Sequence, residues 1–124
     1  MPSLFKNVNV ISMHVANFEA AKKWYTEVLE WPVVFSSDEA GWHEFGRENE
    51  THLSLNRWDP AGGPVPQKGA TPVFSVDDAH AAISALRARG VKCDDVVVIP
   101  GMVHYGTFYD PEGNSLQVAS NGYY

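Results

Sequence analysis

The sequence has almost no cysteine, and its single thiol, Cys93, cannot form a disulfide within the chain. Free thiols persist in reducing compartments, so a cytoplasmic location is expected. No apolar run approaches the roughly 20 residues that a membrane helix needs. The first residues lack a basic region followed by an apolar one, so no secretory signal is predicted. These absences predict a protein that has no membrane as a partner.

Basic side chains are also few, since nine Lys and Arg stand against 15 Asp and Glu and give a formal net charge of −6. No basic cluster occurs, and nucleic acid is therefore not an expected partner. An acidic balance can favour a cationic ligand, but a net charge of this size is ordinary for a soluble protein. Net charge alone selects no ligand.

Several chemical signatures are missing as well. The sequence contains no glycine-rich phosphate loop, no paired-cysteine motif and no local arrangement of Ser, His and Asp that indicates a nucleophilic triad. It does contain enough apolar material for a core, because 44% of its 124 residues are hydrophobic. One compact domain is expected from this length.

The order of predicted elements repeats along the chain. Hydrophobic periodicity in the first half predicts a strand, a helix and three strands, at residues 9–15, 17–29, 32–36, 42–47 and 52–57. The second half predicts the same order, at residues 72–76, 78–90, 92–99, 104–109 and 115–120. The segments MHVANFEAA (13–21) and FSVDDAHAA (74–82) align at an offset of 61 residues. Such a repeat predicts two βαβββ modules.

A Pro- and Gly-rich stretch, residues 59–69, is typical of an exposed linker. It divides the single domain, residues 1–124, into module one at about 8–57, a linker at 58–70 and module two at about 71–120. Asn17 and Asp78 are predicted N-caps of the two helices. Gly90 suits the end of the second helix, whereas Glu30 follows the first, so an unusual helix end is expected there.

Residues 108–120 (FYDPEGNSLQVAS) predict a strand, a tight turn and a second strand. This pattern resembles the final hairpin of the vicinal oxygen chelate superfamily, which includes glyoxalases, extradiol dioxygenases and bleomycin- and fosfomycin-resistance proteins. Residues 18–29 (FEAAKKWYTEVL) are similar to the first helix of these proteins. The resemblance implies an α+β fold in which two βαβββ modules form curved sheets around a cup, a glyoxalase/bleomycin-resistance-like fold. It also implies a homodimer.

In metal-using members of that superfamily, four equivalent strand positions supply mostly His and Glu ligands. The resemblance places these positions at Val10, Ser54, Thr71 and Gln117. Valine cannot bind a metal ion, and the neutral oxygens of Ser, Thr and Gln are poor ligands for transition metals. We therefore predict that the usual metal site is absent and that no cofactor is bound.

Two histidines are predicted to point into the cup together with these positions. Strand alternation gives this facing to His14 and to His52. A relocated metal site would need a third ligand, and Glu44 and His104 are candidates whose facing the sequence leaves open. Inward histidines more often form hydrogen bonds inside a cavity than bind metal.

A cup with converging polar groups and aromatic walls suits an organic ligand. The predicted ligand-binding residues are Ser12, His14, His52, Ser54, Asn56, Thr71, Tyr105 and Gln117. The candidates for aromatic walls are Trp31, Trp42, Trp58, Tyr105 and Phe108. The two other histidines, His43 beside a turn and His80 in the first turn of a helix, are predicted to lie on the solvated surface.

Binding without catalysis is the leading hypothesis for function. It describes a metal-free protein that holds a small organic molecule, as the resemblance to the bleomycin-resistance type implies, with drug sequestration as one such role. One alternative is a lyase, isomerase or dioxygenase that uses a relocated metal. Another is a metal-free enzyme with His14 or His52 as general base, since the ordinary pKa of histidine suits that task.

Overall fold

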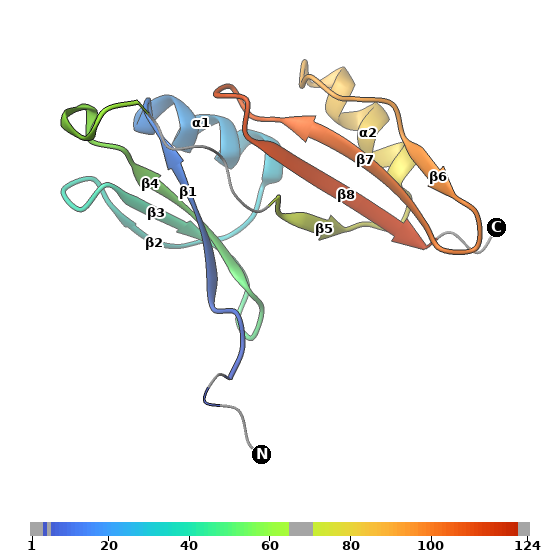
Figure 1. Cartoon of the computed structure of the whole chain (residues 1–124), viewed down its shortest axis with the longest axis horizontal. Coiled ribbons are helices and arrows are strands. Elements are labelled where there is room, and N and C mark those ends of the chain that lie inside the picture. Colours follow the sequence, from blue (N-terminus) through green and yellow to red (C-terminus); the bar gives the residue numbers. More distant parts are fainter. Residues whose placement is uncertain (1–3, 5, 65–70, 122–124) are drawn as a thin grey trace. The chain divides into compact units, whose positions relative to one another are not determined.

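The computed structural model describes residues 4, 6–64 and 71–121 of the chain, which divides into two compact units, Met1–Gln67 and Lys68–Tyr124. Each unit contains a strand, a helix and three further strands in chain order (Figure 1). Part of the predicted linker, residues 65–70, lies outside the described residues. Before it, Pro60–Gly62 form a short 3₁₀ turn, η1, which the sequence did not predict.

The first unit forms a four-stranded mixed sheet, which we call sheet A, with one helix. Its elements are β1 (Val10–Val15), α1 (Phe18–Leu29), β2 (Val33–Ser37), β3 (Trp42–Phe45) and β4 (His52–Arg57). The strand order is β1-β4-β3-β2, in which β1 and β4 run parallel and the other neighbours run antiparallel. Strands β1 and β2 are therefore the edges of sheet A.

The second unit forms sheet B and repeats this plan. Its elements are β5 (Val73–Ser75), α2 (Ala79–Ala88), β6 (Val97–Ile99), β7 (Val103–Tyr109) and β8 (Ser115–Asn121). The strand order is β5-β8-β7-β6, with β5 and β8 parallel. The strand predicted at residues 92–99 is shorter than expected, and its first part makes only an isolated bridge between Cys93 and Phe108. The predicted α+β class, with two βαβββ modules, is confirmed.

The ends of both helices follow the predicted capping. The Asn17 side chain accepts a hydrogen bond from the Ala20 amide at 3.1 Å, and Asp78 accepts one from the His80 amide at 2.9 Å. Such bonds satisfy amides that have no partner within the helix. Glu30 ends α1 with a φ of 54°, in the left-handed region that glycine usually occupies. The unusual end expected for the first helix is confirmed.

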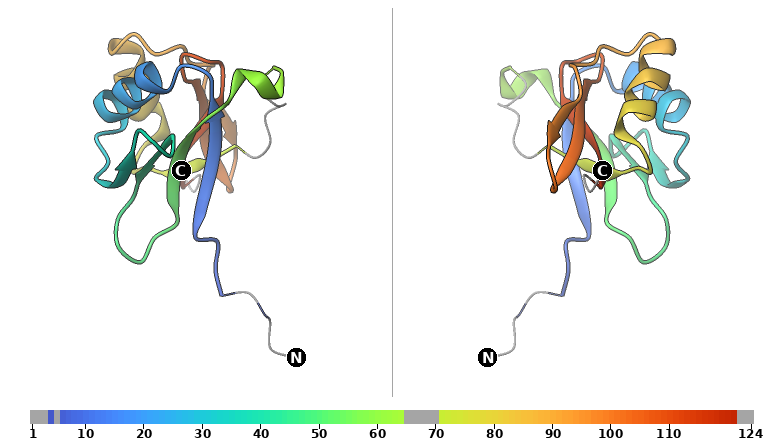
Figure 2. Two further views of the ribbon diagram at one scale, coloured as in Figure 1. Left: turned by 90° about the vertical axis from the view of Figure 1, so that its left-hand side faces the viewer. Right: turned by 90° about the vertical axis from the view of Figure 1, so that its right-hand side faces the viewer.

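Each helix covers one face of its own sheet (Figure 2). Helix α1 buries Phe18, Ala21 and Tyr25, and the Tyr25 hydroxyl lies 4.0 Å from the sulfur of Met13 on β1. In the second unit Ile83 packs on Gly106 of β7, where an added Cβ would lie 2.4 Å from the Ile83 side chain. Among the described residues, no helix is long and apolar enough to cross a membrane. Within each unit, the α-helix packs on one face of the sheet and does not cover the opposite face.

His43 is buried, so its predicted place on the solvated surface is wrong. Only 7% of the residue is exposed. Its Nδ1 lies 2.7 Å from the Ser36 hydroxyl, and its ring packs edge-on against Phe45 at 4.7 Å. Proximity to a turn suggested exposure, but the strand alternation of β3 turns this side chain toward α1.

Replacing His43 by leucine should reduce the acid sensitivity of the fold. Burial lowers the pKa of His43, and the charge of Lys22 lowers it further. The unfolded chain, with an ordinary histidine pKa of about 6.5, then takes up a proton before the folded chain does. Stability is therefore complete above about pH 6.5 and falls as the pH drops through the lowered pKa. Urea unfolding of His43→Leu should show a smaller loss than wild type.

The matched control is Ser36→Ala, which keeps the imidazole and removes only its hydrogen bond. This variant should remain as acid-sensitive as wild type, measured between about pH 7.5 and about pH 5. An unchanged loss of stability in His43→Leu would contradict the burial argument.

Candidate functional site

One face of sheet A lies opposite its helix, and we call it the polar face of sheet A. Strand register places Ser54 of β4 between Ser12 of β1 and Glu44 of β3. Because Met13 meets α1, alternation directs these side chains away from the helix. The side chains on this face are those of Val10, Ser12, His14, Trp42, Glu44, His52, Ser54 and Asn56.

The facing that the sequence predicted for His14 and His52 agrees with this register. The sequence could not decide the facing of the strand at 42–47. The structure places Trp42 and Glu44 on the polar face and His43 on the face of α1. A carboxylate thus joins the predicted set of neutral polar groups.

Glu44 is held by two neighbours on the polar face. The Trp42 indole Nε1 donates to Glu44 Oε1 at 2.9 Å, and His52 Nδ1 lies 2.5 Å from Glu44 Oε2. Both side chains of the pair are mostly buried, with about a fifth exposed. The bond to Glu44 raises the pKa of His52, and the bond from His52 lowers the pKa of Glu44. The two groups form an ion pair across β3 and β4.

The second nitrogen of His52 is also engaged. Nε2 lies 3.1 Å from the Arg47 carbonyl oxygen, which can only accept, so Nε2 donates. Nδ1 faces a carboxylate and Nε2 a carbonyl oxygen, and this arrangement favours the doubly protonated, charged ring. The ring also lies against Gly46, where an added Cβ would come within 2.1 Å of it. Strand β3, predicted to reach residue 47, ends at Phe45 just before this contact.

His14 and Ser54 differ from His52 in this respect. His14 Nδ1 and Ser54 Oγ are buried and have no hydrogen-bond partner among the residues that the structure describes. The His14 ring meets the Trp58 ring edge-on, with 5.1 Å between their centroids. A buried polar atom that lacks a partner is costly, so both atoms have unused capacity for a hydrogen bond. They lie on adjacent strands of the polar face.

Sheet B has a corresponding face opposite α2, which we call the polar face of sheet B. Gln117 lies opposite Thr107 in the register and donates to its hydroxyl at 3.1 Å. Thr71 Oγ1 lies 2.9 Å from Ser115 Oγ, which brings Thr71 to the same face. Tyr105, two residues from Thr107 on β7, shares the face and is half-buried. Gln117 and Thr71 are thus each bonded to a neighbouring hydroxyl of this face.

Three other candidates lie elsewhere. Phe108 is 1% exposed on the side of sheet B that meets α2, so its predicted role as an aromatic wall is wrong. His104 is buried on that side, and its Nδ1 lies 3.0 Å from Nε2 of the exposed His80. Trp31 follows α1 and stacks under the Arg47 guanidinium at 6.0 Å. Strand alternation from Leu116 and Val118 could have placed Phe108 in the core.

The residues present do not fit a metal ion. Within residues 4, 6–64 and 71–121, no group of three or more His, Cys, Asp or Glu side chains could hold one. Glu44 and His104, the two candidates for a third ligand, are engaged with His52 and His80 respectively. The relocated metal site therefore lacks a donor set in the described part of the chain.

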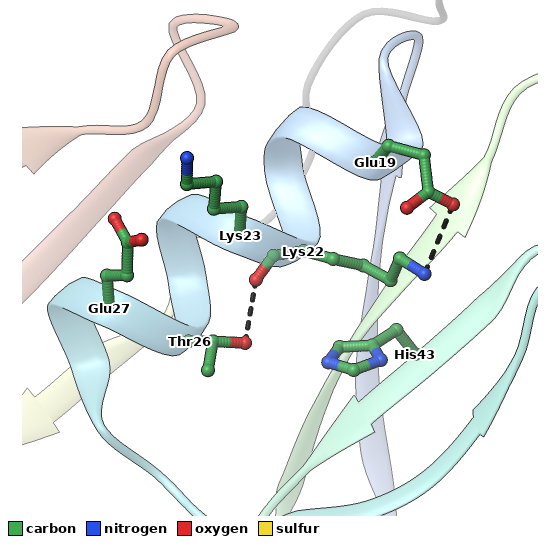
Figure 3. A pocket seen from close by; sticks show the side chains of 6 residues that line it. All are labelled: Glu19, Lys22, Lys23, Thr26, Glu27 and His43. Carbon is green, nitrogen blue, oxygen red and sulfur yellow. Dashed lines mark hydrogen bonds and ion pairs between the residues drawn. The ribbon is translucent and has the colours of Figure 1, made fainter.

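A separate pocket of about 350 Å³ lies beside α1, between side chains of the helix and His43 of β3 (Figure 3). Its lining residues are Glu19, Lys22, Lys23, Thr26, Glu27 and His43. Lys22 extends over it to Glu19 at 3.2 Å and to Asp38 at 2.5 Å. None of the predicted ligand-binding residues lines this pocket. The ammonium group of Lys22 is already paired with two carboxylates, those of Glu19 and Asp38.

Replacing Glu44 by glutamine should lower the pKa of His52 toward its ordinary value. The charged partner that favours the imidazolium is then lost. In wild type the pKa of His52 is raised, so the ion pair contributes fully to folding stability below the ordinary histidine pKa. This contribution is lost as the pH rises through the raised pKa. The lowered Glu44 pKa sets the acid limit, since the pair is lost as the pH falls through it. NMR titration of the His52 ring protons measures the shift.

Trp42→Phe is the matched control, because it removes only the indole bond to Glu44. His52 should keep a raised pKa in this variant. An unchanged His52 titration in Glu44→Gln would show that the two groups are not coupled in solution.

Several solved structures share this fold. TnmS3, an antibiotic binding protein from Streptomyces sp. CB03234, is 24% identical with a TM-score of 0.78, over 97% of this chain and 99% of that one. Lactoylglutathione lyase from Agrobacterium tumefaciens is 18% identical with a TM-score of 0.72, over 95% and 96%. A superfamily member from Sphaerobacter thermophilus DSM 20745 is 20% identical with a TM-score of 0.78, over 96% and 100%. At these identities the likeness shows the fold alone.

The family itself is shown by the sequence. No curated protein matches the chain. The sequence model of a superfamily matches residues 7–118, a span that includes all strands and both helices except the last residues of β8. The resemblance drawn from the final hairpin and the first helix is confirmed. The chain belongs to the Glyoxalase/Bleomycin resistance protein/Dioxygenase superfamily.

Proposed function

We propose that this protein binds a small organic molecule, without a metal ion, on the polar face of sheet A. The observation that carries the proposal is the pair of buried atoms on this face without a described partner, His14 Nδ1 and Ser54 Oγ. A ligand that offers a hydrogen-bonding edge would satisfy both and recover the cost of their burial. The indoles of Trp42 and Trp58 flank these groups and suit the apolar body of such a ligand.

The residues at the family's four metal-ligand positions support a metal-free function. Val10 has no donor atom, and Ser54, Thr71 and Gln117 offer only neutral oxygens. Gln117 and Thr71 also spend their side chains on bonds to neighbouring hydroxyls. An organic ligand, unlike a metal ion, does not need charged or imidazole ligands at these four positions.

Sheet B contributes its own residues to the proposal. Thr71, Tyr105 and Gln117 lie on its polar face and remain proposed ligand contacts, to be tested separately from sheet A. The likeness to an antibiotic binding protein supports binding as the activity, and drug sequestration is one form that it can take. Neither nucleic acid nor a membrane is a proposed partner, and the free thiol of Cys93 suits a cytoplasmic location.

A metal-free enzyme is the second candidate, and His14 is the residue that favours it. The Nδ1 of His14 has no described partner, so it can accept a proton from a bound molecule. His52 cannot take this role while both of its nitrogens donate to Glu44 and Arg47. Turnover of a bound compound that is lost in His14→Ala would favour catalysis over binding.

A homodimer is also proposed, because each sheet has an edge strand with exposed apolar side chains. Val33, Val34 and Phe35 of β2 are 45–56% exposed, and Val97, Val98 and Ile99 of β6 are 39–45% exposed. Apolar edge strands need cover, and a second copy of the chain offers a matching edge. The superfamily resemblance implies the same assembly.

Protein purified without chelators should contain no stoichiometric Zn, Ni, Fe or Mn, as measured by plasma spectrometry. Added metal should leave the melting temperature nearly unchanged, because weak sites give little stabilisation. A thermal-shift screen of small organic molecules should give hits. These should bind about tenfold more weakly to His14→Ala and Ser54→Ala, the loss expected for one hydrogen bond.

His80→Ala is the matched control, since His80 lies in helix α2 of the second unit and should not affect these hits. About one metal ion per chain, lost in His14→Ala, would overturn the proposal. It would make a relocated metal site the better account.

Light scattering at micromolar concentration should give the mass of a dimer. Val34→Glu places a charge on the exposed β2 edge and should shift the mass toward that of a monomer. Thr26→Glu, on the exposed surface of α1, is the control and should leave the dimer intact. A monomer mass for wild type would refute this part of the proposal.

A further inference from the structure

The strands of this protein are almost free of charge. The sequence contains 24 Asp, Glu, Lys and Arg residues, yet the described strands of both sheets contain only Glu44 and Arg57. Arg57 lies opposite Val15 and over the Phe18 ring at 5.5 Å, on the side of α1. Glu44 is therefore the one such residue on either polar face within the described strands. The net charge of −6 arises in helices, turns and loops.

The charge of Glu44 is cancelled where it stands. His52 Nδ1 faces Glu44 Oε2 at 2.5 Å, a contact that favours the positively charged ring, and His52 Nε2 faces a carbonyl oxygen. The turn before β4 adds Arg47, Glu48 and Glu50, one cation and two anions, which lie outside the strands. The strand residues of the polar face of sheet A thus present hydroxyl, amide, imidazole and indole groups with no net charge.

We infer that the ligand of this site is an uncharged molecule with a flat apolar body and a hydrogen-bonding edge. The inference rests on the proposed function and names its ligand class. An ionic ligand would lose its hydration on this face and find no opposite charge that is not already paired, which costs several kcal/mol per ion. An uncharged amide or hydroxyl group loses far less and can bond to Ser54 Oγ and His14 Nδ1. The acidic composition of the chain is therefore no guide to its ligand.

Three probes of one shape test this inference: 2-naphthamide, which is uncharged, 2-naphthoate, an anion, and 2-naphthylmethylammonium, a cation. Calorimetry at neutral pH should give binding of the amide at least about tenfold tighter than binding of either ion. His52→Gln leaves Glu44 unpaired, so the preference should move toward the cation. Glu44→Gln leaves the imidazole without its partner and should move the preference toward the anion at about pH 6.

The double variant Glu44→Gln/His52→Gln has an uncharged face again and should regain the preference for the amide. If a single variant fails to fold, which circular dichroism detects, the double variant still tests the inference. Wild-type binding of the cation or the anion as tightly as the amide would overturn the inference, even if the proposed function holds. Failure of all three probes to bind would also overturn it for this class of flat ligand. The proposed function is decided separately by the thermal-shift screen and the metal analysis.

Discussion

The ion pair of Glu44 and His52 is the interaction on which the polar face of sheet A depends. It joins β3 to β4, fixes Glu44 Oε2 and holds the imidazole against Gly46, just after the end of β3, while the Trp42 indole holds Glu44 Oε1. It also pairs Glu44, the one Asp, Glu, Lys or Arg residue that the described strands place on a polar face. With that pair satisfied, the buried atoms of this face that lack a described partner are His14 Nδ1 and Ser54 Oγ. The proposed function and the inferred ligand class both follow from this division between satisfied and unsatisfied groups.

Much of the fold could be predicted from the sequence because local signals agree with the repeat. Asn17 and Asp78 are strong caps, and both helices begin directly after them. The strand at 52–57 has the bounds that alternation predicts, and the facing of His14 and His52 follows from the same period of two. The final hairpin identified the family, since its turn demands Pro111 and Gly113 in fixed places.

The rest depends on contacts between segments that no local pattern encodes. The strand at 42–47 is short and has polar residues on both faces, so its facing, and with it the roles of His43 and Glu44, required the register with β4. His52 was predicted as a ligand contact, but its two bonds to Glu44 and Arg47 arise only when β3 and β4 pair. The prediction of Phe108 as an aromatic wall is wrong because Phe108 lies opposite Leu116, on the face of sheet B that forms the core.

Native mass spectrometry of the protein isolated from its host tests the central claim most directly. The claim is that this superfamily member holds a small organic molecule without metal. It predicts a noncovalent mass increment of an uncharged organic compound, present in wild type and depleted in His14→Ala. An increment equal to the mass of a transition-metal ion, with no organic compound, would contradict it.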